Sequence, residues 1–290
     1  MEKIVIGVSD TASMKAVDWV IDRASTRVVE VTLVAAYDWT GAPFSEVAAL
    51  LQTVRARIGS ATPRTAVHLV ESEDDPDHAL AEATGHADLL VIGSHQRSRL
   101  QERFGVRSLR LARQENCATV IVPERWMPIH SGVIVVGLDD ESSTSALDFA
   151  VTEAEASGAR LEVVHAWTAP LPAFNPLVWV VDTEGELREA HRGRLGAVLD
   201  RLKAEHPRAR VSGYLEECLP AAALRDRGKA ADLIVIGSHR EGPIVRAILG
   251  TAARDLLHDG SVPLCIVPAR SGHDQPELVP ARAKAASPGD

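Results

Sequence analysis

Residues 87–95 read Ala-Asp-Leu-Leu-Val-Ile-Gly-Ser-His, and residues 231–239 repeat them almost unchanged as Ala-Asp-Leu-Ile-Val-Ile-Gly-Ser-His. Similarity at so long a spacing indicates two copies of one structural unit. In each copy an unbroken apolar run precedes Gly-Ser-His, which is typical of a strand that is buried on both faces and followed by a loop. The chain is therefore predicted to hold two parallel-sheet units in tandem.

Three further segments recur in the same order. Residues 4–8 match 134–138, residues 34–39 match 163–167 more loosely, and residues 118–123 match 263–268. The offset grows from 137 − 7 = 130 at the first strand to 232 − 88 = 144 near the end, so the second copy has a longer middle. We expect one long amphipathic helix over residues 181–206, where the first copy has only residues 44–57.

The alternation of apolar runs with helical stretches defines the fold class. The helical stretches include residues 11–24, 143–156 and 245–257. We predict an α/β protein of two tandem doubly wound units, each a five-stranded parallel sheet flanked by helices on both faces. The ligand crevice of such a unit lies at the carboxyl ends of the strands, where the winding reverses.

The predicted domain boundaries follow from the repeat and from composition. The first unit covers residues 1–124, a linker covers 125–132, and the second unit covers 133–269. Residues 270–290 have no apolar periodicity and are predicted to be a disordered tail. The two units are expected to pack through their edge strands about a pseudo-two-fold axis.

Composition narrows the class of protein. The 290 residues are 46% hydrophobic and 24% charged, as in a folded globular protein. A formal charge of −9 provides no broad basic surface, so nucleic acid and membranes are not expected partners. No signal peptide or membrane span is evident, which favours the cytoplasm. The three cysteines lack metal or redox spacing and are interpreted as core thiols.

Two segments of the second copy could carry chemistry. The strand ending at Gly137 leads into Leu138 and Asp139, whose carboxylate suits recognition of a base or ribose; alternatively, Asp139 caps a helix or faces water. The strand ending at Ile236 leads into Gly237 and a loop that reaches residues 250–251, Gly-Thr, at a helix start. Backbone N–H groups there could line a phosphate-sized concavity, although loop glycines also form ordinary turns.

On these motifs the second copy resembles a universal stress protein domain over nearly its whole length. The resemblance rests on Val-Gly-x-Asp at the first strand tip, Val-His-Ala-Trp in the next strand and Ile-Gly-Ser-His at residues 236–239. ATP-binding members of that family carry Gly-x-x-Gly, nine residues, then Gly-Ser or Gly-Thr. Here Gly237 and Gly250 keep the spacing of 250 − 237 = 13, but Arg240 replaces the middle glycine.

The resemblance implies a set of nucleotide-binding residues and a cofactor, ATP with Mg²⁺. Asp139 and Ala166 would contact adenine and ribose, and the phosphates would lie near the loop. Arg240 either fills the phosphate space or binds phosphate oxygens through its guanidinium. The full predicted set is Gly137, Asp139, Ala166, Ile236, Gly237, Arg240, Gly250 and Thr251.

The first copy departs further from the family pattern. Ser9 stands where the strand-tip acid belongs, although the adjacent Asp10 could partly substitute for it, and Gln96 replaces the middle glycine. Gly93 and Gly105 are 12 residues apart instead of 13, and Val106 follows in place of Ser or Thr. We therefore expect this unit to bind nucleotide poorly or not at all.

Two other features favour structural interpretations. His95 and His239 follow Gly-Ser in both copies, but neither has a second ligand at suitable spacing, so loop-stabilising histidines are favoured over a metal site. The acidic run at residues 71–75 lacks the ordered spacing of a calcium loop and is interpreted as a solvated loop. The sequence predicts no metal site.

The function favoured by the sequence is a stress-response regulatory protein that binds ATP or another adenine nucleotide, mainly in its second unit. A conventional enzyme is not predicted, because no nucleophile, general base or Walker motif is evident; the pattern leaves slow ATP hydrolysis open. The alternatives are a nucleotide-free dimerisation scaffold and an ATP-dependent enzyme on a related fold. A homo-oligomer and an unidentified regulatory protein are the other expected partners.

Overall fold

The computed structural model describes residues 1–9, 13–36, 44–73, 75–94, 117–139, 143–168, 183–238, 255–257 and 260–269. Each half of the chain alternates strands with helices along the sequence. The first unit comprises β1 (Glu2–Gly7), α1 (Ser13–Ala24), β2 (Val29–Ala36), α2 (Phe44–Ala61), β3 (Ala66–Ser72), α3 (Pro76–Thr84), β4 (Leu89–Ser94) and β5 (Ala118–Pro123).

The second unit repeats this order. It comprises β6 (Val133–Leu138), α5 (Ser143–Ser157), β7 (Arg160–Trp167), α6 (Thr183–Glu205), β8 (Arg210–Glu217), α7 (Pro220–Gly228), β9 (Leu233–Ser238) and β10 (Leu264–Pro268). The predicted fold class is confirmed, because each unit contributes five parallel strands with helices on both faces.

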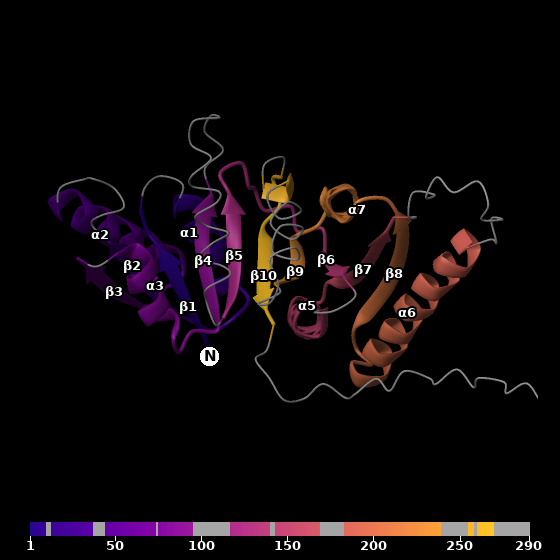
Figure 1. Ribbon diagram of the computed structural model, residues 1–290. Helices are drawn as coiled ribbons and strands as arrows, with labels where there is room; N and C mark the ends of the chain where they lie inside the picture. Colours follow the sequence, from indigo (N-terminus) through magenta and orange to yellow (C-terminus); the bar gives the residue numbers. More distant parts are fainter. Residues whose placement is uncertain are drawn as a thin grey trace, which may run out of the picture.

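All ten strands form one sheet, in the order β3-β2-β1-β4-β5-β10-β9-β6-β7-β8 (Figure 1). Strands are parallel within each unit, and only β5 and β10 pair antiparallel. The chain winds outward from β1 to β3 and then returns to the other side of β1 with β4; the second unit does the same from β6 to β8 and back to β9. The winding therefore reverses between β1 and β4 and between β6 and β9.

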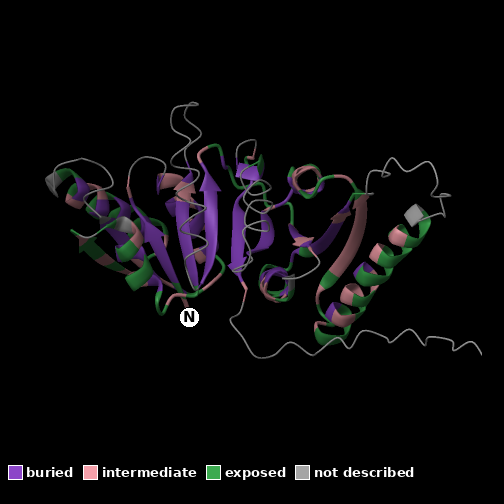
Figure 2. Ribbon diagram, viewed as in Figure 1, coloured by how far each residue is buried: buried purple, intermediate pink, exposed green. Residues whose placement is uncertain are grey.

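Two apolar layers hold the helices against the sheet. One cluster joins α1, α2, α5 and α6 to one face, and the other joins α3 and α7 to the opposite face. The inner strands are buried along nearly their whole length, whereas the outer strands β3 and β8 and most of α6 are partly exposed (Figure 2). Because both clusters include residues from both units, the two units share a continuous core.

The seam between the units has pseudo-two-fold symmetry. In its antiparallel register Cys265 faces Val120. These two residues occupy the same position in the repeat, since 265 − 120 equals the offset of 268 − 123 = 145 between the last strands. The axis that relates the two units therefore passes beside this pair. The expectation that the units pack through their edge strands agrees with this geometry.

Expected and observed helices agree closely within the described residues. The long helix of the second unit is α6, and the shorter counterpart in the first unit extends to Ala61. Only residues 255–257 of the helix expected over 245–257 are described, and they are helical. The sequence reasoning missed α3 and α7, two nine-residue helices that each begin with proline.

The interpretation of residues 71–75 as a solvated loop was wrong in part. Glu71 and Ser72 are the last residues of β3, and the Asp75 side chain accepts a hydrogen bond from the Asp77 N–H at 2.9 Å. Asp75 is thus the N-cap of α3, with Pro76 in the first turn. An N-cap acid followed by proline was the available signal, and the acidic composition masked it.

An aspartate that both copies of the repeat share anchors the start of each unit. Asp88 accepts a hydrogen bond from the Lys3 N–H at 2.8 Å, and Asp232 accepts from the Ser131 and Gly132 N–H groups at 2.8 Å each. The Asp of the Ala-Asp dipeptide therefore fixes the entry into the first strand of both units. Among the described residues, no helix is both long and apolar enough to cross a membrane.

Candidate functional site

The carboxyl ends of β7, β6 and β9 form the part of the second unit where a ligand crevice is expected. These strands are neighbours, and β6 pairs in parallel with both of the others. The register aligns Val136 with Val235, so the next residues of the two strands are Gly137 and Ile236. The winding reverses at this pair of strands, which is where ligands bind in open α/β sheets.

Gly137 lies in a tightly packed position. A Cβ atom added to it would lie 3.3 Å from Leu224 Cδ1 of α7 and 3.7 Å from Ile236 Cγ2. The first distance is shorter than ordinary van der Waals contact, so a side chain here would force the Leu224 side chain to move. Glycine at this position therefore allows α7 to pack against the ends of β6 and β9.

Asp139 and Ala166 lie beside each other at the next step of the sheet. Leu138 is aligned with His165, and the residues that follow them are Asp139 and Ala166. Both are half-buried, so they lie at the boundary between the core and solvent. A carboxylate beside a small side chain leaves room for a flat group that carries hydrogen-bond donors, such as a ribose or a base.

Gly237 completes the described part of the predicted site. It is buried at the end of β9 and aligned with Val267 of β10. Five of the eight predicted residues thus lie at one edge of the sheet: Gly137, Asp139, Ala166, Ile236 and Gly237. The other three, Arg240, Gly250 and Thr251, lie outside the described residues, as do His95 and His239.

A buried histidine supports this edge, and sequence reasoning did not single it out. His165 is 2% exposed, and its Nδ1 lies 2.9 Å from the Leu138 carbonyl oxygen. Since a carbonyl oxygen can only accept, Nδ1 carries the proton and donates it. The imidazole therefore fastens the last residue of β6, immediately before Asp139, to β7. A lone histidine in an apolar strand was the signal.

His165 also connects the edge to α6. Its Nε2 lies 2.8 Å from His191 Nδ1, so the neutral pair is satisfied when His191 donates to His165. Burial lowers the pKa of His191 below its ordinary value of 6.5, and the nearby His165 lowers it further. Two imidazolium rings cannot keep this contact, because both nitrogens would then be donors.

Aromatic and charged groups surround His191. Its ring stacks on Trp167 with centroids 5.1 Å apart, and the Arg188 guanidinium lies 5.6 Å from the Trp167 ring centroid. Arg188 also pairs with Glu217 at the end of β8. The helix α6 is thereby attached to the carboxyl ends of β7 and β8 through side chains of one turn.

The corresponding edge of the first unit differs in chemistry. Ser9 follows β1, where the second unit has Asp139, and its N–H donates to Ser13 Oγ at 2.9 Å. Of the other first-unit positions that depart from the pattern, Gly93 is half-buried in β4, whereas Gln96, Gly105 and Val106 lie outside the described residues. The first unit therefore offers no carboxylate at the Ser9 position.

The described residues contain no group of three or more His, Cys, Asp or Glu side chains placed to hold a metal ion. Cys117 and Cys265 are buried and Cys218 is half-buried. Burial raises the pKa of the Cys265 thiol well above its ordinary value, and the Glu153 carboxylate raises it further. Cys117 and Cys265 thus behave as core thiols, as expected, and Cys218 is a free thiol at the margin of the core.

These features define the class: a tandem pair of doubly wound α/β units with a candidate ligand crevice at the winding reversal of the second. The model of the universal stress protein family matches residues 1–123 and again residues 131–268. The chain belongs to the universal stress protein family, with two copies of its domain.

Known relatives agree with this assignment. The universal stress protein Rv2005c of Mycobacterium tuberculosis is 30% identical over 205 residues, which cover 66% of this chain and 65% of that protein. The match thus spans just under two thirds of that relative's length. A universal stress protein of Mycolicibacterium smegmatis is 24% identical over 288 residues, covering 91% of this chain and 96% of the relative.

A solved structure shows the same fold. The universal stress protein from Archaeoglobus fulgidus superposes with a TM-score of 0.66 at 15% identity, and the match covers 92% of this chain and 96% of that one. A likeness at this level of identity concerns the fold alone. The likeness in fold thus extends over both units of this chain.

Proposed function

We propose that the second unit binds an adenine nucleotide, with ATP as the expected ligand, and that this binding regulates a stress response. The observation that carries the proposal is the convergence of Asp139, Ala166 and Gly237 at the winding reversal of one sheet. Each residue comes from a different strand, so a ligand at this edge would contact all three strand ends at once. Membership of the universal stress protein family supports the assignment to stress response.

Each residue has a chemical role in this proposal. The Asp139 carboxylate accepts hydrogen bonds from ribose hydroxyls or the adenine amino group, and Ala166 leaves space for the flat base beside it. Gly237 lets the nucleotide approach the backbone at the end of β9. Arg240, Gly250 and Thr251 would hold the phosphates, and Mg²⁺ would arrive bound to phosphate oxygens.

The described residues of this edge belong to the base and ribose end of the proposed site. Asp139 and Ala166 are half-buried rather than sealed within the core, so an entering ligand can reach them. The imidazole of His165 holds Leu138, the residue before Asp139, in place. Asp139 thus projects from a fixed strand end, which limits the ordering that binding must impose.

A nucleotide-free scaffold is the second candidate, and one observation favours it. The ten-stranded sheet and its shared core join the two units through strand pairing and apolar packing. In the first unit Ser9 replaces the strand-tip acid, so that unit already fits a structural role. In this alternative the second unit would also have only a structural role, and its Asp139 carboxylate would bind no nucleotide.

Calorimetry with nucleotide-stripped protein distinguishes the candidates. ATP, ADP and AMP, each with and without Mg²⁺, are titrated into the full chain, and the ATP sample is then analysed for ADP by chromatography. The proposal predicts saturable binding of at least one adenine nucleotide and ATP recovered largely intact. Heat no greater than that of a buffer blank for all three nucleotides would leave the nucleotide-free scaffold as the remaining candidate. Rapid formation of ADP would indicate an enzyme.

A further inference from the structure

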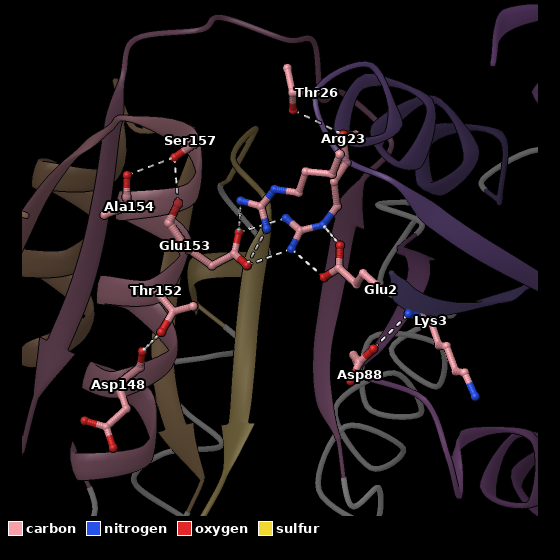
Figure 3. A network of polar contacts seen from close by, with 11 residues as sticks. Glu2, Lys3, Arg23, Thr26, Asp88, Asp148, Thr152, Glu153, Ala154 and Ser157 are labelled. Atoms are coloured by element: carbon pink, nitrogen blue, oxygen red, sulfur yellow. Dashed lines mark hydrogen bonds and ion pairs between the residues drawn. The ribbon is translucent and has the colours of Figure 1, made fainter. Parts of the chain in front are cut away.

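The charged cluster at the seam between the units comprises Glu2, Arg23, Arg27 and Glu153. Figure 3 shows Glu2, Arg23 and Glu153 of this cluster. Arg23 of α1 donates to Glu153 of α5 through Nη1 at 2.8 Å and Nη2 at 2.6 Å, which is a bidentate pair. Arg27 donates to the same carboxylate at 3.0 and 2.9 Å. The Glu153 carboxylate thus accepts four hydrogen bonds, and all four donors belong to the first unit.

Arg23 and Glu153 occupy the same position in the two repeats. Their separation, 153 − 23 = 130, equals the offset between Ser13 and Ser143, the first residues of α1 and α5. The helices lie on the same face of the sheet as Val120 and Cys265, the strand residues beside the pseudo-two-fold axis. One repeat position therefore meets itself across the axis, and it carries opposite charges in the two copies.

This arrangement could not persist between two identical units. A pair of first units would bring Arg23 against a second Arg23, and a pair of second units would bring Glu153 against a second Glu153. Both side chains are nearly buried, with exposed fractions of 7% and 8%. In a pair of second units Glu153 would lose its four donors from the first unit, and in a pair of first units Arg23 would keep only Glu2 of its own unit. Removing one partner of a nearly buried ion pair in this way is strongly destabilising.

We propose that the Arg23–Glu153 pair makes the β5/β10 edge accept only a unit of the opposite kind, so that first unit pairs with second unit and like units are rejected. The partner that fits the first-unit edge is a universal stress domain with an acid at the Glu153 position. Two chains can meet through this edge only by exchanging units, which keeps every first unit against a second unit. The inference does not depend on nucleotide binding.

The surrounding contacts assist the selection. Glu2 of the first unit accepts from Arg23 Nε at 2.9 Å and from Nη2 at 2.7 Å, so the guanidinium is held on both sides. Gly132 occupies the position of Glu2 in the second copy, since 132 − 2 = 130. Likewise Ser157 occupies the position of Arg27, and it donates to the backbone oxygen of Glu153 at 2.7 Å. The supporting charges thus belong to the first unit alone.

The test uses two full-length variants that reverse one charge each. Arg23→Glu gives a chain with acids at both positions, and Glu153→Arg gives a chain with arginines at both. Each variant on its own brings like charges together at the seam, whichever of its units pair. When the two variants are mixed, exchange of units gives one seam with the native Arg23–Glu153 pair and one seam in which the two charges are interchanged. We therefore expect a one-to-one complex of the two chains. Native mass spectrometry with tags of different mass detects it.

Matched controls use charge reversals of the exposed pair Arg192 and Glu189 on α6, which should give no mixed complex above that of tagged and untagged wild type. We expect at least about tenfold more mixed complex from the seam variants, corresponding to the 1.4 kcal/mol that a tenfold ratio represents. A mixed fraction equal to that of the α6 controls would overturn the proposal.

A second measurement covers the case in which the single variants fold poorly. The chain that carries both Arg23→Glu and Glu153→Arg should melt at a higher temperature than either single variant, because opposite charges face each other again. Recovery will be partial, since Glu2 and Arg27 keep their charges. A double variant that melts below both single variants would contradict selection by this pair.

Discussion

His165 donates its Nδ1–H to the Leu138 carbonyl oxygen at 2.9 Å, so a buried imidazole fastens the end of β6 to its neighbour β7. The residue after Leu138 is Asp139, the proposed nucleotide contact. Because His165 also meets His191 of α6, the same ring connects the site edge to the long helix of the second unit. The backbone just before Asp139 is therefore held by a buried side chain that is not among the proposed nucleotide contacts.

Replacing His165 with leucine should weaken both stability and binding. The apolar side chain leaves the Leu138 oxygen and the His191 nitrogen without this partner, which costs about 1–3 kcal/mol. Thermal unfolding measures the loss, and nucleotide affinity should fall several-fold. His206→Leu is the control, since His206 meets Glu155 near the other end of the sheet. Equal affinity of both variants would show that His165 does not position Asp139.

Acid should destabilise the chain through His191. Its pKa is lowered in the folded protein, so the unfolded chain takes up this proton first as the pH falls. Stability therefore decreases from about pH 6.5 down to the folded-state pKa and is constant below it. Unfolding by urea at pH 7.5 and pH 5.5 should show a larger loss for wild type than for His191→Gln. His86→Gln, at an exposed position, should behave as wild type.

Glu153→Gln should destabilise the seam by about 3 kcal/mol, because the nearly buried Arg23 and the partly buried Arg27 lose this counter-charge. Burial alone would raise the pKa of Glu153, but hydrogen bonds from Arg23 and Arg27 outweigh it and hold the pKa below 4.5. The contribution is therefore complete above pH 4.5 and is lost as pH falls through the lowered pKa.

Unfolding of wild type and of Glu153→Gln across the acid range tests whether the stabilising contribution of Glu153 is lost as the pH falls. The difference between them should be constant near neutral pH and should narrow below pH 4.5. The exposed Glu189, whose replacement by glutamine should change stability by less than about 1 kcal/mol, is the control. A difference that grows on acidification would refute the assigned charge state.

Gly137→Val should cost about 1–3 kcal/mol and also weaken nucleotide binding. The added side chain would meet Leu224 and Ile236, which pack the end of β6. At Gly196 of α6 nothing lies within 4 Å of an added Cβ, so Gly196→Ala should stabilise the helix by about 0.5–1 kcal/mol. Calorimetric melting of both variants gives the comparison, and a tolerated Gly137→Val would indicate a loosely packed edge.

Much of the fold could be predicted because its signals are local or repeated. The apolar runs that end at Gly93 and Gly237 are β4 and β9, and the long helix expected over residues 181–206 is α6. The short helices α3 and α7 were missed, because nine residues that include proline give little periodicity. Asp75 shows the difficulty, since its role as N-cap depends on one hydrogen bond.

The tertiary relationships were less accessible from the sequence. Arg23 and Glu153 lie in helices that were predicted, yet their contact requires the antiparallel pairing of β5 with β10, which the repeat alone does not fix. In the sequence, His165 belongs only to a repeated strand pattern and His191 only to a long helical pattern. Their pairing follows from the distance between α6 and β7, which no pattern in either segment encodes.

The central claim is that the second unit binds an adenine nucleotide through Asp139, and titration of ATP with Mg²⁺ into wild type, Asp139→Ala and Ser9→Ala tests it most directly. Ser9 holds the same position in the first unit, so Ser9→Ala is the matched control. We predict about one site per chain and an affinity at least about tenfold weaker for Asp139→Ala, since a hydrogen bond to a charged group contributes about 1.5–3 kcal/mol. Ser9→Ala should bind as wild type does. No saturable binding up to millimolar ATP, or equal affinity of wild type and Asp139→Ala, would contradict the claim.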